Sequence, residues 1–179
     1  MSSLLKDIFK IIEITIINLL IGLFLYPFLH ELGHSIMIIC FKAKLLEFNV
    51  FPVPYVLCDL TGLTEIKTIL IGMAGNFFPV IILFLFSFIK INNFWVWLTK
   101  LFLSYICLLS FGISFISIFI VKFGYFEIVK EDDFAQLVNL YNNSSILLSI
   151  VCLFMIVLLS ILIKKLKPIK NFIIFIDKN

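Results

Sequence analysis

Two histidines and a glutamate are spaced in this sequence as hydrolytic metal chemistry requires. They lie in the run His30-Glu31-Leu32-Gly33-His34, and the chain has only these two histidines. Positions i and i+4 of a helix share one face, so both imidazole rings can reach one metal ion. Glu31 projects from the same turn, close enough to act on a water at that metal. The pattern predicts a zinc site with His30 and His34 as ligands and Glu31 as general base.

The residues around this run favour a functional role for the histidines. A buried histidine can also be structural, with its ring nitrogens bonded to backbone carbonyl groups. Here the flanking residues are almost entirely Leu, Ile and Phe, and ionisable groups in such a setting are costly and usually functional. We therefore expect one zinc ion per chain at this position.

The composition predicts an all-α integral membrane protein. Hydrophobic residues make up 63% of the 179 positions and charged residues 14%, and the mean hydropathy is +1.20. A soluble domain needs more polar residues to cover its surface. The net charge of +3 is small and no basic tract is present, which argues against nucleic-acid binding. The bias toward Ile, Lys, Phe and Asn is typical of AT-rich prokaryotic genomes, so we expect a multi-pass protein of a prokaryotic cell membrane.

The apolar segments predict a single membrane-embedded domain, residues 1–179, with about four transmembrane helices. A helix needs about 20 residues to cross the hydrocarbon core. The predicted spans are residues 14–41, 66–89, 94–121 and 145–163. Pro27 is expected to kink the first span or open its hydrogen-bond ladder. Residues 1–13 indicate a short interfacial helical start, and the lysine-rich residues 164–179 indicate a tail on the membrane surface.

Two connecting segments, residues 42–65 and 122–144, are expected to face water. In the first, Pro52 and Pro54 exclude a helix, and the β-branched and aromatic residues favour one or two short strands or a re-entrant loop at the membrane surface. An unpaired strand edge there would suit a substrate in extended form. The alternative interpretation is a plain connecting loop.

A polar residue, Asn76, lies inside the second predicted span, beside the small residues Gly72, Ala74 and Gly75. Small residues allow close contact between helices. Asn76 is either an interhelical hydrogen-bonding group or a group that binds substrate backbone or a developing oxyanion near the metal. The serines of the third span are expected only to pack between helices; they are Ser104, Ser110, Ser114 and Ser117.

A site with two histidines still needs a third protein ligand. Among the acidic residues that follow, Asp132 and Asp133 are best placed, because they open a helical pattern on the side of the membrane where the first span ends. An acidic pair at a helix start also has a structural role, as N-cap and first-turn acid. Spacing alone leaves both residues open as ligands.

The order of these features resembles the site-2 protease family of intramembrane zinc metalloproteases. The resemblance covers most of residues 14–140: the histidine run in the first span, Gly75-Asn76 in the second, and the acidic pair ahead of the last span. The chain departs from the family in lacking its usual Gly-Pro pair and Asn-x-x-Pro motif. It also carries no PDZ or CBS domain, so the resemblance implies a minimal catalytic core.

The resemblance implies that His30, His34 and a distant aspartate bind zinc, and that Glu31 activates water. The family's aspartate usually stands in an Asp-Gly pair that leads a helix. Matching the pattern that follows places Asp133 there, with Phe134 at the glycine position, and leaves Asp132 as the second choice. The implied activity is cleavage of a membrane-spanning or membrane-anchored protein substrate.

Two other functions fit the same histidine run. The first is a membrane protease similar to the Ste24 and HtpX-like enzymes, which take a glutamate from a later helix as third ligand; Glu127 and Glu131 are available. The second is a membrane protein that binds metal without catalysis, either for structure or as a carrier. Hydrolysis requires Glu31 as well as the histidines, whereas metal binding requires only the histidines.

Overall fold

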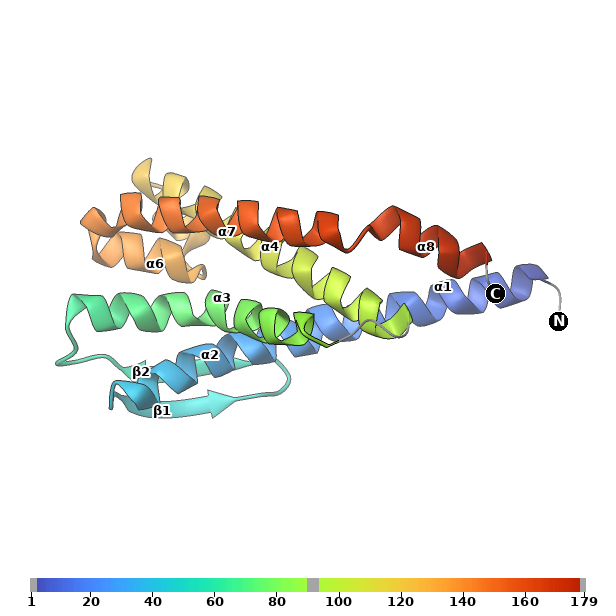
Figure 1. Ribbon diagram of the computed structural model, residues 1–179. Coiled ribbons are helices and arrows are strands. Elements are labelled where there is room, and N and C mark those ends of the chain that lie inside the picture. The colour runs from blue at the N-terminus through green and yellow to red at the C-terminus, as the bar shows by residue number, and fades with distance from the viewer. Residues whose placement is uncertain (1–2, 90–93, 178–179) are drawn as a thin grey trace.

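The computed structural model describes residues 3–89 and 94–177 of the chain (Figure 1). Within these residues four helical segments are long and apolar enough to cross a membrane: Ile8–Cys40, Glu65–Ser87, Phe94–Lys122 and Asn142–Ile173. A two-stranded sheet follows the first of them. The predicted helical architecture, with four long apolar helices and one short extended segment, is therefore confirmed.

The first long segment is a continuous helical unit with a local change of register. It consists of α1 (Ser3–Leu20), the π-helical turn η1 (Ile21–Leu25) and α2 (Tyr26–Cys40). Pro27 has no N–H for the helical ladder, and its ring would clash with a carbonyl four residues earlier. The ladder widens just before it, where the backbone N–H of Tyr26 bonds the carbonyl of Ile21, five residues back. Pro27 thus opens the ladder, as predicted.

The predicted helical start is present at the beginning of this segment. α1 begins at Ser3 and continues into the predicted span, and an interfacial position of its first turns stays a prediction. Residues 3–20 contain neither proline nor glycine, so the local sequence offers nothing that would end a helix. At the other terminus, α8 (Pro168–Asp177) is a distinct helix that begins after Lys167, which has a φ of 46°.

The segment after α2 forms a β-hairpin. β1 (Lys44–Asn49) and β2 (Tyr55–Asp59) pair in antiparallel register, from Lys44 opposite Asp59 to Asn49 opposite Tyr55. The hairpin lies alongside α2 (Figure 1), and the rings of Phe28 and Phe48 are 6.5 Å apart across that contact. The alternative of a plain connecting loop is therefore wrong.

The remaining long helices are α3 (Glu65–Ser87), α4 (Phe94–Lys122) and α7 (Ser145–Lys165). Both α3 and α7 pack against α4. On its other side α3 packs against α2, and a Cβ added to Gly33 would lie 2.6 Å from the Cβ of Phe78 and closer still to the carbonyl oxygen of Ala74. Only glycine permits this close approach, so Gly33 sets the spacing between α2 and α3.

A short helical segment between α4 and α7 completes the fold. It contains α5 (Phe126–Val129), α6 (Asp133–Leu140) and the 3₁₀ turn η2 (Asn142–Ser144). Phe134 is fully buried, with its ring 6.2 Å from that of Phe111 on α4. Phe134 is therefore a core anchor that holds α6 against α4. This contact brings the start of α6 to the end of the bundle opposite the chain termini (Figure 1).

Candidate metal centre

α2 places the two predicted histidines one turn apart on the face that it turns toward α3. The Nε2 atoms of His30 and His34 lie 3.2 Å apart, and the rings meet edge to face at 4.8 Å between centroids. A Cβ added to Gly75 of α3 would lie 2.7 Å from Nε2 of His30 and closer still to Nε2 of His34. Gly75 therefore leaves the room in which both ring nitrogens converge.

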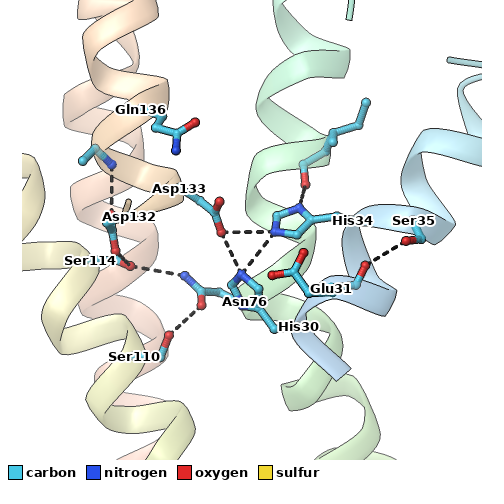
Figure 2. Close-up of polar contacts among 12 residues, drawn as sticks. His30, Glu31, His34, Ser35, Asn76, Ser110, Ser114, Asp132, Asp133 and Gln136 are labelled. Carbon is cyan, nitrogen blue, oxygen red and sulfur yellow. Dashed lines mark hydrogen bonds and ion pairs between the residues drawn. The ribbon is translucent and has the colours of Figure 1, made fainter. Parts of the chain in front are cut away.

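The third side chain comes from α6. Oδ2 of Asp133 lies 2.9 Å from Nε2 of His30 and 3.2 Å from Nε2 of His34. All three side chains point toward one another in Figure 2. Their ligand atoms are close enough together to hold one metal ion. The structure thus brings together two residues from α2 and one from α6, as the spacing and the resemblance had suggested.

A backbone contact orients the second histidine. Nδ1 of His34 lies 2.8 Å from the carbonyl oxygen of Ile71 on α3. A carbonyl only accepts hydrogen bonds, so Nδ1 carries a proton and, in the neutral ring, Nε2 is the lone-pair nitrogen. Metal-binding histidines are commonly held in this way by a second partner. For His30, Nδ1 is buried and has no hydrogen-bond partner among the described residues.

Three electron-rich atoms at these distances repel one another unless a cation lies among them. A proton on an imidazole can meet that need, and so can a metal ion. Zinc bonds of about 2.0–2.1 Å imply separations of roughly 3.3 Å between ligands at the corners of a tetrahedron. The separations here are 2.9, 3.2 and 3.2 Å. Two imidazoles and one carboxylate therefore fit zinc in both chemistry and spacing, with a fourth position left for water.

The two neighbouring aspartates have opposite electrostatic environments. Burial by itself would raise the pKa of Asp133, but the imidazoles of His30 and His34, which donate to its carboxylate when their Nε2 atoms carry protons, outweigh burial and hold its pKa well below the ordinary value. For Asp132, burial raises the pKa in spite of hydrogen bonds from Ser114 and from the backbone of Ala135. Asp133 is thus the aspartate kept ionised toward the histidines.

Asp132 acts as the N-cap of α6. Its Oδ1 accepts a hydrogen bond from the backbone N–H of Ala135 at 2.9 Å. The two glutamates considered as third ligands differ from Asp133. Glu127 has 82% of its side chain exposed and pairs with Lys130 at 3.5 Å, whereas Glu131 lines the cavities beside the histidines but is not part of the converging group. The geometry therefore favours Asp133 over the other three acids.

Glu31 lies beside the two imidazole rings (Figure 2) and lines two cavities. One, of about 210 Å³, also borders Tyr26 and Asn76. The other, of about 410 Å³, lies between β2 and α6 and is lined by residues 55–58 of β2. Asp133 lines both cavities as well. A molecule in either cavity therefore reaches the point where the three ligand atoms converge.

Asn76 joins three helices by hydrogen bonds. Its Oδ1 accepts from the hydroxyl of Tyr26 at 3.2 Å and from Oγ of Ser110 at 2.6 Å. Its Nδ2 donates to Oγ of Ser114 at 3.2 Å. The side chain is 3% exposed, so the interhelical role is present in the structure. The substrate-binding role of Asn76 stays a prediction.

The expectation that the serines of α4 only pack is wrong for two of them. Ser110 bonds Asn76, and Ser114 bonds both Asn76 and Asp132 (Figure 2). The sequence contained a signal, because serines four residues apart share one face of a helix. Which helix that face would meet depended on how α4 is rotated in the bundle.

Comparisons of the chain with protein-family models, with curated proteins and with solved structures found no match. The geometry and chemistry of the site therefore carry the functional argument. Two imidazoles and one carboxylate converge on a point, a second carboxylate stands beside them, and two cavities reach the same place.

Proposed function

We propose that the chain is an integral membrane zinc endopeptidase of the site-2 protease type. The observation that carries the proposal is the convergence of His30, His34 and Asp133, with Glu31 at the edge of both adjoining cavities. Three protein ligands and an open fourth position are typical of catalytic zinc sites, whereas structural sites are closed by four.

The exterior of the long helices supports a place in the membrane. Large apolar side chains stand exposed along them, among them Phe84 on α3, Leu109 and Ile113 on α4, and Phe154 on α7. Apolar surface of this extent is unfavourable in water and matches the acyl chains of a bilayer. We propose a multi-pass protein of a prokaryotic cell membrane.

The chemistry follows from what each residue does. When bound, zinc supplies Lewis acidity, which lowers the pKa of a coordinated water toward neutrality and polarises a carbonyl group. His30, His34 and Asp133 would hold that ion. As the oxygen of water bonds to the peptide carbonyl carbon, Glu31 would take a proton from the water and deliver it to the amide nitrogen, whose bond to that carbon then breaks. Such proton transfer by a positioned carboxylate is worth about 10²- to 10⁴-fold in rate.

The hairpin supports a protein substrate in extended form. β2 pairs with β1 on one side in the two-stranded sheet, and residues 55–58 of β2 line the larger cavity beside Glu31 and Asp133. A strand that lacks a partner on one edge can bind an extended peptide through backbone hydrogen bonds. Peptide carbonyls of a helix are shielded by its own ladder, so a membrane-spanning or membrane-anchored substrate would be cleaved where it unwinds.

The two rival functions make different demands on the site. A protease with a glutamate ligand needs Glu127 or Glu131 at the histidines, and the group that converges contains Asp133 instead. A protein that binds metal without catalysis needs no carboxylate beside the ligands, yet Glu31 lines both cavities. These observations favour the endopeptidase.

The test measures bound metal and peptide cleavage on the same preparations. Detergent-purified wild type is analysed for its metal content and assayed with a panel of quenched-fluorescent single-span peptides, beside Glu31→Gln, His34→Ala and the exposed control Glu127→Gln. We expect about one zinc per chain in all but His34→Ala, and cleavage only in the wild type and Glu127→Gln. Wild type without metal after reloading would overturn the zinc site, and full activity in Glu31→Gln would overturn the catalytic role.

A further inference from the structure

A buried hydroxyl on α4 bonds the residue that caps the start of α6. Oγ of Ser114 on α4 donates to Oδ2 of Asp132 at 2.7 Å. The other oxygen, Oδ1, accepts from the backbone N–H of Ala135 at 2.9 Å. One oxygen of Asp132 therefore caps its own helix, and the other anchors that helix to α4.

The direction of these hydrogen bonds is determined by their chemistry. The amide Nδ2 of Asn76 can only donate, so Ser114 accepts from it at 3.2 Å. The Asp132 carboxylate can only accept, so Ser114 donates to it. Ser114 is 1% exposed and Asn76 is 3% exposed, and loss of the hydroxyl would leave the buried amide of Asn76 and the half-buried carboxylate of Asp132 without this partner.

α6 depends on such an anchor because it is short. Its eight residues, Asp133–Leu140, are fewer than the roughly 12–15 that an isolated helix needs to be even marginally stable in water. Its position must therefore come from tertiary contacts, of which the Phe134 ring supplies one side and the Ser114–Asp132 bond the other. Asp133 is the residue directly after the cap, so a displaced cap displaces its carboxylate.

We propose that Ser114 is a positioning residue of the metal centre, which acts through the Asp132 cap to aim Asp133 at the two histidines. The inference rests on the metal site proposed above. Ser114 does not touch the three ligand atoms. It determines where α6 starts and thereby how well Oδ2 of Asp133 meets the two ring nitrogens.

The experiment measures metal affinity and ligand geometry rather than cleavage. Purified full-length chain is stripped of metal and titrated with Co²⁺ against a competing chelator, and the visible absorption of the cobalt form reports the ligand geometry. The variants are Ser114→Ala, Asp132→Asn and the double variant. Asp132→Asn keeps an oxygen for the helix cap but presents an amide to Ser114. Ser104→Ala is the matched control, because Ser104 is also buried on α4 and its Oγ bonds the carbonyl of Lys100 in its own helix.

We expect Ser114→Ala to weaken Co²⁺ binding by about 10- to 100-fold, as the loss of other outer partners of metal sites does, and to change the cobalt spectrum. Ser104→Ala should keep both affinity and spectrum. The double variant should lose little more than either single variant, since both break one link. Ser114→Thr, which keeps the hydroxyl, should restore the wild-type spectrum.

Two results would overturn the inference while leaving the metal site intact. One is an unchanged affinity and spectrum in Ser114→Ala. The other is a double variant whose loss is the product of the two single losses. A general packing defect would appear instead as equal losses in Ser114→Ala and Ser104→Ala, which also contradicts the inference. Wild type that binds no Co²⁺ would contradict the proposed metal site itself.

Discussion

Nε2 of His34 lies 3.2 Å from Oδ2 of Asp133, although 99 positions separate the two residues in the chain. His34 lies on α2, near the end of the first long apolar helical segment, and Asp133 opens a short helix at one end of the bundle. Their contact joins α2 to α6 across the face of α3. A cation bound there would therefore connect α2, in the first half of the chain, to α6, in the second half.

This relationship predicts which acid binds the metal. Asp133→Asn should lose bound zinc, because a neutral amide is a weak ligand and the negative charge at the site is gone. Glu127→Gln and Glu131→Gln should keep about one zinc per chain. Elemental analysis of the three purified variants decides between them, and zinc retained in Asp133→Asn but lost in either glutamate variant would move the third ligand to that glutamate.

Because α3 packs closely against the histidines, one added methyl group on α3 is predicted to weaken metal binding. Gly75→Ala should weaken metal binding by about 10-fold or more, since the new Cβ would occupy the space of the two Nε2 atoms. Gly112→Ala is the matched control on α4, where an added Cβ meets nothing within 4 Å. Alanine is favoured over glycine in a helix by about 0.5–1 kcal/mol, so this control should be at least as stable as wild type. Chelator competition measures affinity, and equal affinities in the two variants would contradict the packing argument.

The pH dependence of metal binding should come from the histidines and not from Asp133. The imidazoles of His30 and His34, which donate to Asp133 when their Nε2 atoms carry protons, hold the pKa of Asp133 below its ordinary value in spite of burial. A carboxyl with a lowered pKa keeps its stabilising interaction above its unfolded pKa of about 3.9 and loses it only as the pH falls through the folded value. Protons compete with a metal ion for an imidazole ligand, because only an unprotonated ring nitrogen binds metal.

Affinity should therefore decrease as the pH falls, by up to about two log units per pH unit when both imidazoles are protonated. Chelator competition at several pH values provides the measurement. Constant affinity down to pH 5 followed by a loss near pH 4 would instead indicate that a carboxyl group controls binding.

The sequence pattern predicts that residues 42–65 face water, whereas the structure of the hairpin turn within them predicts a contact with lipid. Phe51 and Val53 are 72% and 68% exposed, and the hairpin runs back along α2, with Phe48 against Phe28. Exposed apolar residues at the depth of a spanning helix would contact acyl chains. A spin label at Phe51→Cys, with the native cysteines replaced, should collide more with oxygen than with a water-soluble nickel complex in lipid vesicles.

A label at Thr61→Cys provides the control, because Thr61 is exposed just beyond the other end of β2. It should show the opposite preference, for the water-soluble complex. Equal collision rates for the two labelled positions would show that the turn lies outside the hydrocarbon.

The local sequence pattern was sufficient to predict part of this structure. The four long helices follow from runs of apolar residues, and the shared face of His30 and His34 follows from helical periodicity alone. Glu31 stands beside both rings for the same reason. Pro27 opens the ladder because a proline has no N–H wherever it lies in a helix. Such features depend on residues within a few positions of one another.

Tertiary packing decided the rest. Asp132 and Asp133 are chemically alike and adjacent, and the choice between them depends on how α6 is rotated against α4, which the burial of Phe134 and the bond from Ser114 determine. Ser110 and Ser114 became partners of Asn76 only because α3 and α4 pack with those faces together. The sequence by itself determined the local periodicities and the reactive types of side chain. The tertiary structure decided which of them meet, because the rotation and spacing of helices depend on contacts between residues far apart in the chain.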